Sequence, residues 1–124
     1  MSALPYMPLF VDDFEAATAH LTFEEDGVYN RLLRLCWRTS GCSIPADPVW
    51  IARLMRCDLN TYHDLVAPIL KEFFTVDNGR IYQRRQRKEF AYTRDLAQKR
   101  AAAGRKGGRP ANPLETAEKS KSKA

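Results

Sequence analysis

The sequence predicts a small, mainly helical α+β domain: a three-helix core with a β-hairpin, then a basic helix and a polar tail. Two patterns indicate this fold class. Apolar residues recur every three or four positions in three segments between residues 22 and 73, and short apolar runs flank an Asp-Asn-Gly turn at 77–79. Charge is also divided along the chain. Residues 1–79 carry six Lys/Arg and eleven Asp/Glu, whereas residues 80–124 carry fourteen Lys/Arg and four Asp/Glu.

The first core helix is predicted over residues 22–41. Thr22 and Glu25 have the spacing of a capping box, and Gly41 follows the last turn. The acidic residues 24–26 suit the positive N-terminal end of a helix. A broad apolar stripe predicts the buried face: Val28, Tyr29, Leu32, Leu33, Leu35, Cys36 and Trp37.

Two further helices are predicted, beginning after Asp47 and near Asn60. Asp47 is a good N-cap, and Pro48 suits the first helical position because that residue needs no backbone donor. Pro68 is expected to kink the third helix, which ends near Phe73. The residues expected to face the core are Trp50, Ile51, Leu54, Met55, Tyr62, Leu65, Val66, Ile69, Leu70 and Phe73.

A hairpin, a charged helix and a tail complete the prediction. The Asp-Asn-Gly turn at 77–79 predicts a hairpin. A helix with a thin apolar stripe is expected over residues 85–103, and a disordered basic tail over residues 104–124. The order helix, short strand, helix, helix, hairpin is that of a winged helix. We therefore expect a winged-helix-like domain over 5–84, a basic helix over 85–103 and a tail over 104–124.

The composition argues against several classes of protein. The chain has no phosphate-binding loop, no nucleophile elbow and no zinc-protease motif, so we expect no enzyme, no cofactor and no small-molecule substrate. The acidic residues at 12, 13 and 15 are interpreted as the exposed start of a short helix. A zinc site at Cys36, Cys42, Cys57 and His63 would lack the short paired ligand spacings of structural zinc sites, so free thiols and no metal are predicted.

No segment suits a membrane span or a signal peptide, which predicts a cytoplasmic protein without a membrane partner.

The concentration of cations near the hairpin predicts a polyanion partner. We expect DNA contacts that are mainly electrostatic, since the third helix offers acidic rather than basic side chains to a groove. Tyr82 and Tyr92 are the aromatic residues near these cations, and the sequence does not decide between single- and double-stranded DNA. The predicted contacts are Arg80, Arg84, Arg85, Arg87, Lys88, Arg105, Lys106 and Arg109.

Four segments resemble the YdaU-type family of prophage-encoded bacterial proteins: "PYMPLFVDDFEAATAHLTFEEDGVYNRLLRLCW", "LLRLCWRTSGCSIPAD", "FFTVDNGRIYQRR" and "AAAGRKGG". The resemblance covers about residues 5–108, and the sequence departs from the family at "VDDF", where a glycine commonly precedes the aspartate. Members lie among phage replication genes, and some are similar to the N-terminal domain of replication initiation proteins. The resemblance therefore implies a winged-helix module with a role in initiating phage DNA replication.

Two other functions remain open at this point. An adaptor for replisome proteins, such as a helicase or its loader, would bind an acidic partner without contacting DNA. The cations at Arg31, Arg34 and Arg38 would provide its surface, because spacings of three and four place them on one helix face. A transcriptional regulator is the third alternative, and the acidic third helix argues against it.

Overall fold

The computed structural model describes the backbone of residues 4–107 and the side chains up to Gly104. Two compact units divide the chain, Met1–Arg94 and Asp95–Ala124, and their boundary falls within helix α6 (Arg84–Gly107). The protein is α+β and mainly helical, with one small antiparallel sheet, as the sequence predicts. Within the described residues, no helix is long and apolar enough to cross a bilayer.

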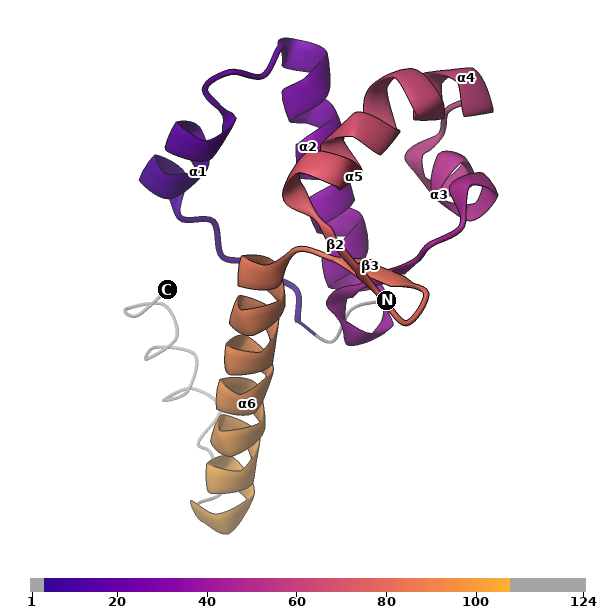
Figure 1. Ribbon diagram of the computed structural model, residues 1–124. Coiled ribbons are helices and arrows are strands. Elements are labelled where there is room, and N and C mark those ends of the chain that lie inside the picture. Colours follow the sequence, from indigo (N-terminus) through magenta and orange to yellow (C-terminus); the bar gives the residue numbers. More distant parts are fainter. Residues whose placement is uncertain (1–3, 108–124) are drawn as a thin grey trace. The chain divides into compact units, whose positions relative to one another are not determined.

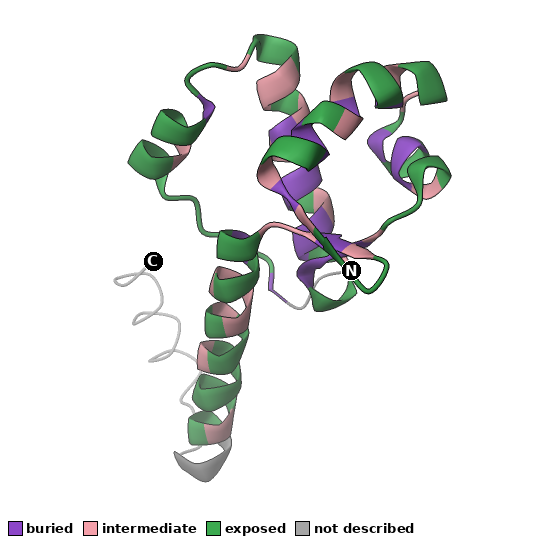
Figure 2. Cartoon of the chain, viewed as in Figure 1, coloured by how far each residue is buried: buried purple, intermediate pink, exposed green. Residues whose placement is uncertain are grey.

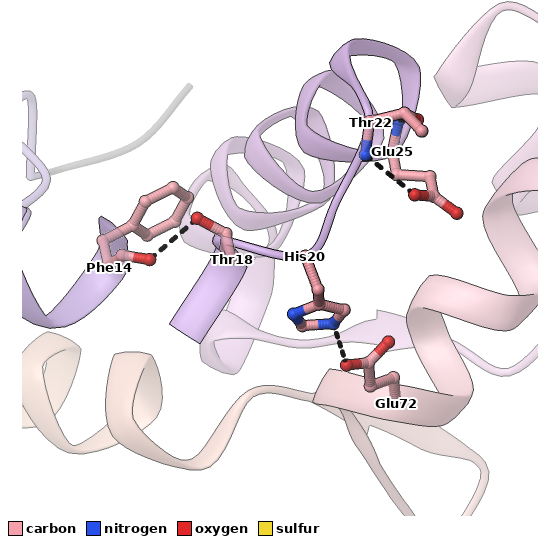
Figure 3. Close-up of polar contacts among 6 residues, drawn as sticks. All are labelled: Phe14, Thr18, His20, Thr22, Glu25 and Glu72. Atoms are coloured by element: carbon pink, nitrogen blue, oxygen red, sulfur yellow. Dashed lines mark hydrogen bonds and ion pairs between the residues drawn. The ribbon is translucent and has the colours of Figure 1, made fainter. Parts of the chain in front are cut away.

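Helix α2 (Phe23–Arg38) is central to the first unit and packs against α3 (Pro48–Met55), the π-helical turn η2 (Tyr62–Val66) and α5 (Ala67–Phe73) (Figure 1). The predicted capping box is confirmed. The Thr22 N–H donates to Glu25 Oε1 at 2.9 Å, and the Glu25 N–H donates to Thr22 Oγ1 at 3.2 Å (Figure 3). The buried face of α2 forms the middle of the core (Figure 2) and consists of Tyr29, Leu32, Leu33, Cys36 and Trp37.

Helix α3 starts at Pro48, as predicted, and Asp47 Oδ1 accepts the Val49 N–H at 3.1 Å. Its inward face differs from the prediction by one residue. Ala52 is buried with Ile51 and Met55, whereas Leu54 is 40% exposed. The small side chain of Ala52 allows close approach to the core, and the opposite face carries Leu54 into solvent.

The predicted third helix is continuous but irregular, formed by α4 (Leu59–Thr61), η2 and α5. The Ala67 N–H donates to the Tyr62 carbonyl five residues earlier, which widens the turn just before Pro68. Pro68 lacks a backbone donor, and its ring would clash with the carbonyl four residues before it in a regular helix. The expected distortion is therefore confirmed as a π-helical turn.

Asp58 caps the start of α4 and gives the stability a defined pH dependence. The Thr61 N–H donates to Asp58 Oδ1 at 2.8 Å, and hydrogen bonding by Thr61 lowers the pKa of this carboxyl below its ordinary 3.8. Because its pKa is lower in the folded state than in the unfolded state, the Asp58 carboxylate stabilises the fold at pH values above its unfolded-state pKa. This stabilisation is lost as the pH falls through the lower, folded-state pKa. We expect the melting-temperature difference between wild type and Asp58→Ala to persist at neutral pH and to vanish in strong acid. Thermal unfolding followed by circular dichroism tests this, with Asp58→Asn as a non-titrating control whose difference from Asp58→Ala should persist in acid.

The sheet has the strand order β1-β3-β2, from β1 (Ile44–Pro45), β2 (Thr75–Asp77) and β3 (Arg80–Tyr82). The strands are antiparallel, and the buried residues Ile44 and Ile81 are paired across β1 and β3. The predicted hairpin is present. Its two turn residues, Asn78 and Gly79, have φ values of 50° and 72°, as a tight type I′ turn requires.

Two glycine-to-alanine substitutions are expected to change stability in opposite directions. Gly79 has a positive φ, so alanine there should cost about 1 kcal/mol through left-handed backbone strain alone, since open space surrounds the position. Gly27 lies inside α2, also with open space, so alanine there should add about 0.5–1 kcal/mol of stability. Urea unfolding measures both variants. A Gly79→Ala variant at least as stable as wild type would contradict the turn.

The segment before α2 forms a side-chain hydrogen bond within α1 and contacts α5 through His20. The Thr18 hydroxyl at the end of α1 (Val11–Thr18) donates to the Phe14 carbonyl at 2.8 Å. In the connection to α2, His20 Nε2 lies 2.6 Å from Glu72 Oε2 on α5 (Figure 3), and the His20 ring stacks on Phe73. His20 therefore links the α1–α2 connection to α5.

Helix α6 begins one residue before the predicted start and continues to Gly107, four residues past the predicted end at 103. Gly104 is helical, although glycine and the polar composition predicted a tail from this point. In the second unit, the exposed cations Lys99 and Arg100 lie on this helix. The rest of the predicted tail, residues 108–124, lies outside the described residues.

Candidate nucleic-acid interface

The first two turns of α6 carry four cations at the end of the helix where cations are least favourable. The backbone dipoles give a helix N-terminus a partial positive charge, which acidic residues usually offset. The first turn of α6 contains no acidic residue. The Gln83 side chain caps the helix, since its Oε1 accepts the Gln86 N–H at 2.6 Å. Backbone and side chains together therefore make this helix start strongly positive.

Arg84 and Lys88 point away from the core. Successive residues of an α-helix are rotated by about 100°. Gln86 is buried against α2, so Arg84 and Lys88, each two residues away, lie on the opposite face of the helix. Both are exposed, and neither forms an ion pair or hydrogen bond with any part of residues 4–104. These two cations are free to bind a partner.

Arg85 connects α6 to the N-terminal segment. Its Nη2 donates to Asp13 Oδ2 at 2.7 Å, and its Cζ lies 4.6 Å from the ring centroid of Phe10. Both charged side chains are at least half exposed, so the ion pair is worth about 1 kcal/mol or less. Arg85 therefore keeps exposed donors, but its charge is partly neutralised.

Arg87 lies over the ring of Tyr82, with its Cζ 4.2 Å from the centroid. This cation–π contact places an exposed guanidinium beside the hairpin and covers a half-buried tyrosine. Tyr92, the other aromatic residue near the cations, is 66% exposed. Of the two tyrosines, Tyr92 is therefore the more available for stacking on a base.

Arg80, which the sequence places on the hairpin as a DNA contact, is turned back toward the body. Its Nε donates to Ser43 Oγ at 3.1 Å, and its Nη2 donates to the Ser43 carbonyl at 2.9 Å and more weakly to the Ser40 carbonyl at 3.4 Å. Half-buried in this position, Arg80 satisfies the main chain of the 3₁₀ turn η1 (Ser40–Cys42) and its neighbour. The geometry gives Arg80 a supporting role in the fold.

The surface of α4, η2 and α5 is not basic and is not suited to contacting DNA bases. Asp64 and Glu72 offset Lys71, and Glu72 is already in contact with His20. A helix that reads base edges in the major groove usually presents Arg, Lys, Asn or Gln. The exposed polar residues here are Asn60, His63, Asp64, Lys71 and Glu72.

The predicted partner surface on α2 does not present three free cations. Arg31 is half-buried, and its Nη1 donates to the Met55 carbonyl at the end of α3 at 3.2 Å. This contact satisfies one of the carbonyls that a helix C-terminus leaves unpaired. Arg34 and Arg38 remain exposed on the outer face of α2.

The three cysteines are free thiols with little reactivity. Burial raises the pKa of both Cys36 and Cys42 to about 12, which keeps these side chains protonated at neutral pH. Cys57 is half-buried, and its pKa is also raised, mainly by desolvation. In the part of the chain that the structure describes, no three His, Cys, Asp or Glu side chains are grouped to hold a metal ion.

Three predicted contacts cannot be placed in the interface. The side chains of Arg105 and Lys106, and all of Arg109, lie outside the described residues. Sequence reasoning in turn missed the residues that orient the cations: Phe10, Asp13, Ser43 and Gln83. Each of these contacts except that of Gln83 joins residues more than 30 positions apart, so no local pattern could reveal it. Gln83 adjoins the helix it caps, but glutamine is not a typical N-cap residue.

These features define a small, mainly helical α+β protein that carries four exposed cations at the start of its last helix. The chain belongs to the family described as "Protein of unknown function (DUF1376)", whose model matches residues 5–91. It is 39% identical over 106 residues to the "Uncharacterized protein YdaU" of Escherichia coli (strain K12), covering 85% of this chain and 35% of that protein. The chain thus spans about a third of the length of that relative. No solved structure matches it.

The predicted membership of a YdaU-type family is confirmed by these matches. The further resemblance to replication initiation proteins remains a prediction.

Proposed function

We propose that this chain is a winged-helix module that binds DNA through its phosphate backbone and assists the initiation of phage DNA replication. The start of α6 supplies the main contact, and the α6 cations beyond it add to the attraction. The replication role rests on the resemblance seen in the sequence. The DNA contact rests on the geometry of α6.

The order and pairing of the elements support a winged helix. A short strand β1 lies between α2 and α3, and a hairpin of β2 and β3 follows the third helix. The strand β3 lies between β1 and β2, so the hairpin joins the strand that precedes it in the chain to form one sheet. This arrangement places the hairpin directly before the cations of α6, where a wing would contact a DNA backbone.

The observation that carries the DNA proposal is the pair Arg84 and Lys88. They lie at the positive end of α6, outward-facing and without a partner among residues 4–104, and the first turn contains no acidic residue. Such a placement costs stability unless an anion offsets it, and helix N-termini are common phosphate-binding positions. Phosphates of DNA satisfy both the side-chain charges and the helix dipole.

The expected mode is electrostatic, with weak dependence on DNA sequence. Arg85 and Arg87 remain exposed enough to join Arg84 and Lys88 at the backbone, whereas Arg80 is held by Ser43. The mixed charge on α4, η2 and α5 gives little means to read base edges in a groove. Phosphate contacts position a protein on DNA without specifying sequence.

Fluorescence anisotropy of the full chain on labelled duplex and single-stranded DNA tests the proposal across a series of salt concentrations. If five to eight cations meet phosphates, log K should fall against log salt with a slope of about −4 to −7. Preference for single strands would point to stacking on Tyr92. Absence of binding to either DNA at low salt would reject the DNA contact.

An adaptor without DNA affinity is the second candidate function. Arg34 and Arg38 are exposed on α2 and offer a basic surface to an acidic replisome protein. The engagement of Arg31 with Met55 reduces that surface to two residues, so we favour DNA. If the anisotropy experiment gives no binding, these two arginines become the first surface to test with a helicase or loader.

A further inference from the structure

Within residues 4–104, Arg85 is the only one of the four cations at the start of α6 that pairs with a carboxylate. Its Nη2 donates to Asp13 Oδ2 at 2.7 Å, and its Cζ lies 4.6 Å from the centroid of the Phe10 ring. Phe10 is the N-cap residue of α1, and Asp13 lies in the first turn of that helix. One short stretch of chain therefore holds the guanidinium twice, by an ion pair and by a cation–π contact.

The stretch that holds Arg85 belongs to the N-terminal segment, residues 4–14, which is fixed at both of its ends. At one end Leu4 is buried, and its carbonyl accepts the Trp37 Nε1–H at 2.7 Å. At the other end the ring of Phe14 stacks on Tyr29 of α2, with centroids 5.3 Å apart. Phe14 directly follows the paired aspartate, so packing positions the carboxylate although its own side chain is exposed. This anchoring reduces the ordering cost that usually weakens an exposed ion pair.

The Asp13 carboxylate competes with DNA for the Arg85 guanidinium. Carboxylates and phosphates both present anionic oxygens to the N–H donors of arginine, so each can occupy the same donors. The side chains of Arg85 and Asp13 are 50% and 61% exposed, which leaves the ion pair open to exchange with an anion from solution. When phosphates approach the neighbouring Arg84 and Lys88, Arg85 has to leave Asp13 before its paired donor can make a phosphate contact.

We propose that the N-terminal segment restrains DNA binding by holding Arg85, and that opening this contact makes the module bind DNA more tightly. The inference rests on the proposed DNA contact at the start of α6 and adds an internal competitor to it. In the closed form, Arg84, Arg87 and Lys88 meet phosphates while Asp13 retains Arg85. In the open form, Arg85 adds a phosphate contact of its own. Because an exposed ion pair is weak, the segment tunes the affinity and does not abolish binding.

The variant Asp13→Asn removes the ion pair and keeps the size of the side chain. We expect it to raise the affinity for DNA about threefold, which is the scale of an exposed ion pair. The plot of log K against log salt should also become steeper by up to about 0.9, because Arg85 gains one phosphate contact. Fluorescence anisotropy of the full chain on labelled duplex and single-stranded DNA across a salt series measures both quantities.

Two control variants, Asp12→Asn and Glu89→Gln, remove the same charge and leave the ion pair in place. Asp12 is exposed and lies in the same first turn of α1, so its loss changes the net charge and the helix dipole interaction in the same way. Glu89 lies one turn along α6 from Arg85 and forms no ion pair with any part of residues 4–104. Each control should raise the affinity by less than about 1.5-fold through the general field. A gain in Asp13→Asn no larger than theirs would overturn the restraint.

An Arg85→Gln background shows whether the gain passes through this cation. In that background, Asp13→Asn should raise the affinity no more than Asp12→Asn does, because the two effects are coupled through one contact. A full gain there would contradict the inference, since the carboxylate would then act by repulsion alone. If wild type binds DNA and the three acidic variants match one another, the restraint fails and the DNA contact stands. If neither wild type nor Asp13→Asn binds at low salt, both proposals fail, whereas binding by Asp13→Asn alone would support the restraint.

Discussion

The double substitution Arg84→Gln with Lys88→Gln is expected to weaken DNA binding by about tenfold to a hundredfold at moderate salt. Both side chains face away from the core and have no partner among residues 4–104, so their removal should leave the fold intact. Each lost phosphate contact reduces the salt slope by about 0.9. The slope should therefore become shallower by about 2, which distinguishes lost contacts from general damage. Anisotropy across a salt series measures both quantities.

A matched control removes the same charge elsewhere. Arg34→Gln with Arg53→Gln also deletes two exposed cations, from α2 and α3, and is expected to change the affinity by about threefold or less through the general field alone. Equal losses in the two double variants would show that DNA responds to net charge and not to the start of α6. Circular dichroism confirms that both variants retain their helices.

Replacing Trp37 with alanine is expected to lower the free energy of unfolding by about 3–5 kcal/mol. Trp37 lies in the last turn of α2 and is 4% exposed, and its ring meets Phe90 of α6 edge-on with centroids 5.1 Å apart. Its Nε1–H donates to the buried Leu4 carbonyl at 2.7 Å. Alanine would leave a cavity and remove this hydrogen bond at once, a large fraction of the about 5–15 kcal/mol typical of a folded domain.

Urea unfolding followed by far-ultraviolet circular dichroism measures this loss. Phe23→Ala provides the comparison, because Phe23 is also a large aromatic residue of α2 but is 97% exposed, and its replacement should cost about 0.5 kcal/mol or less. Trp37→Phe should fall between the two, since it keeps an apolar ring and loses the donor. A loss below about 1 kcal/mol in Trp37→Ala would contradict the packing of α6 on α2.

The helices and the hairpin were predictable because their signals are local. Thr22 with Glu25, Asp47 with Pro48, and Asn78 with Gly79 act within a few residues of the element that each one starts or turns, and all three are confirmed. The errors in the buried faces and at helix ends have tertiary causes. Leu54 has a helical apolar spacing, but Ala52 turns toward the core, and Gly104 continues a helix that its composition was expected to end.

The candidate interface was predictable only as a group of charges. The sequence shows five cations between residues 80 and 88, and nothing in their spacing separates one from another. Their partners come from distant positions: Ser43 holds Arg80, Asp13 pairs with Arg85, and Gln86 is buried on the Leu33 carbonyl. Burial of Gln86 turns Arg84 and Lys88 outward, and that distinction exists only in the folded chain.

The sequence by itself determined the class of the fold, the order of its elements and the separation of an acidic body from a basic C-terminal part. Capping, turn chemistry and apolar periodicity act over one or two turns of chain, so they can be recognised without the rest of the molecule. Only the tertiary structure decided which cations of residues 80–88 are held by other side chains and which face outward without a partner among residues 4–104. Those properties depend on burial and on contacts between residues far apart in sequence, as between Met7, Leu33 and Gln86.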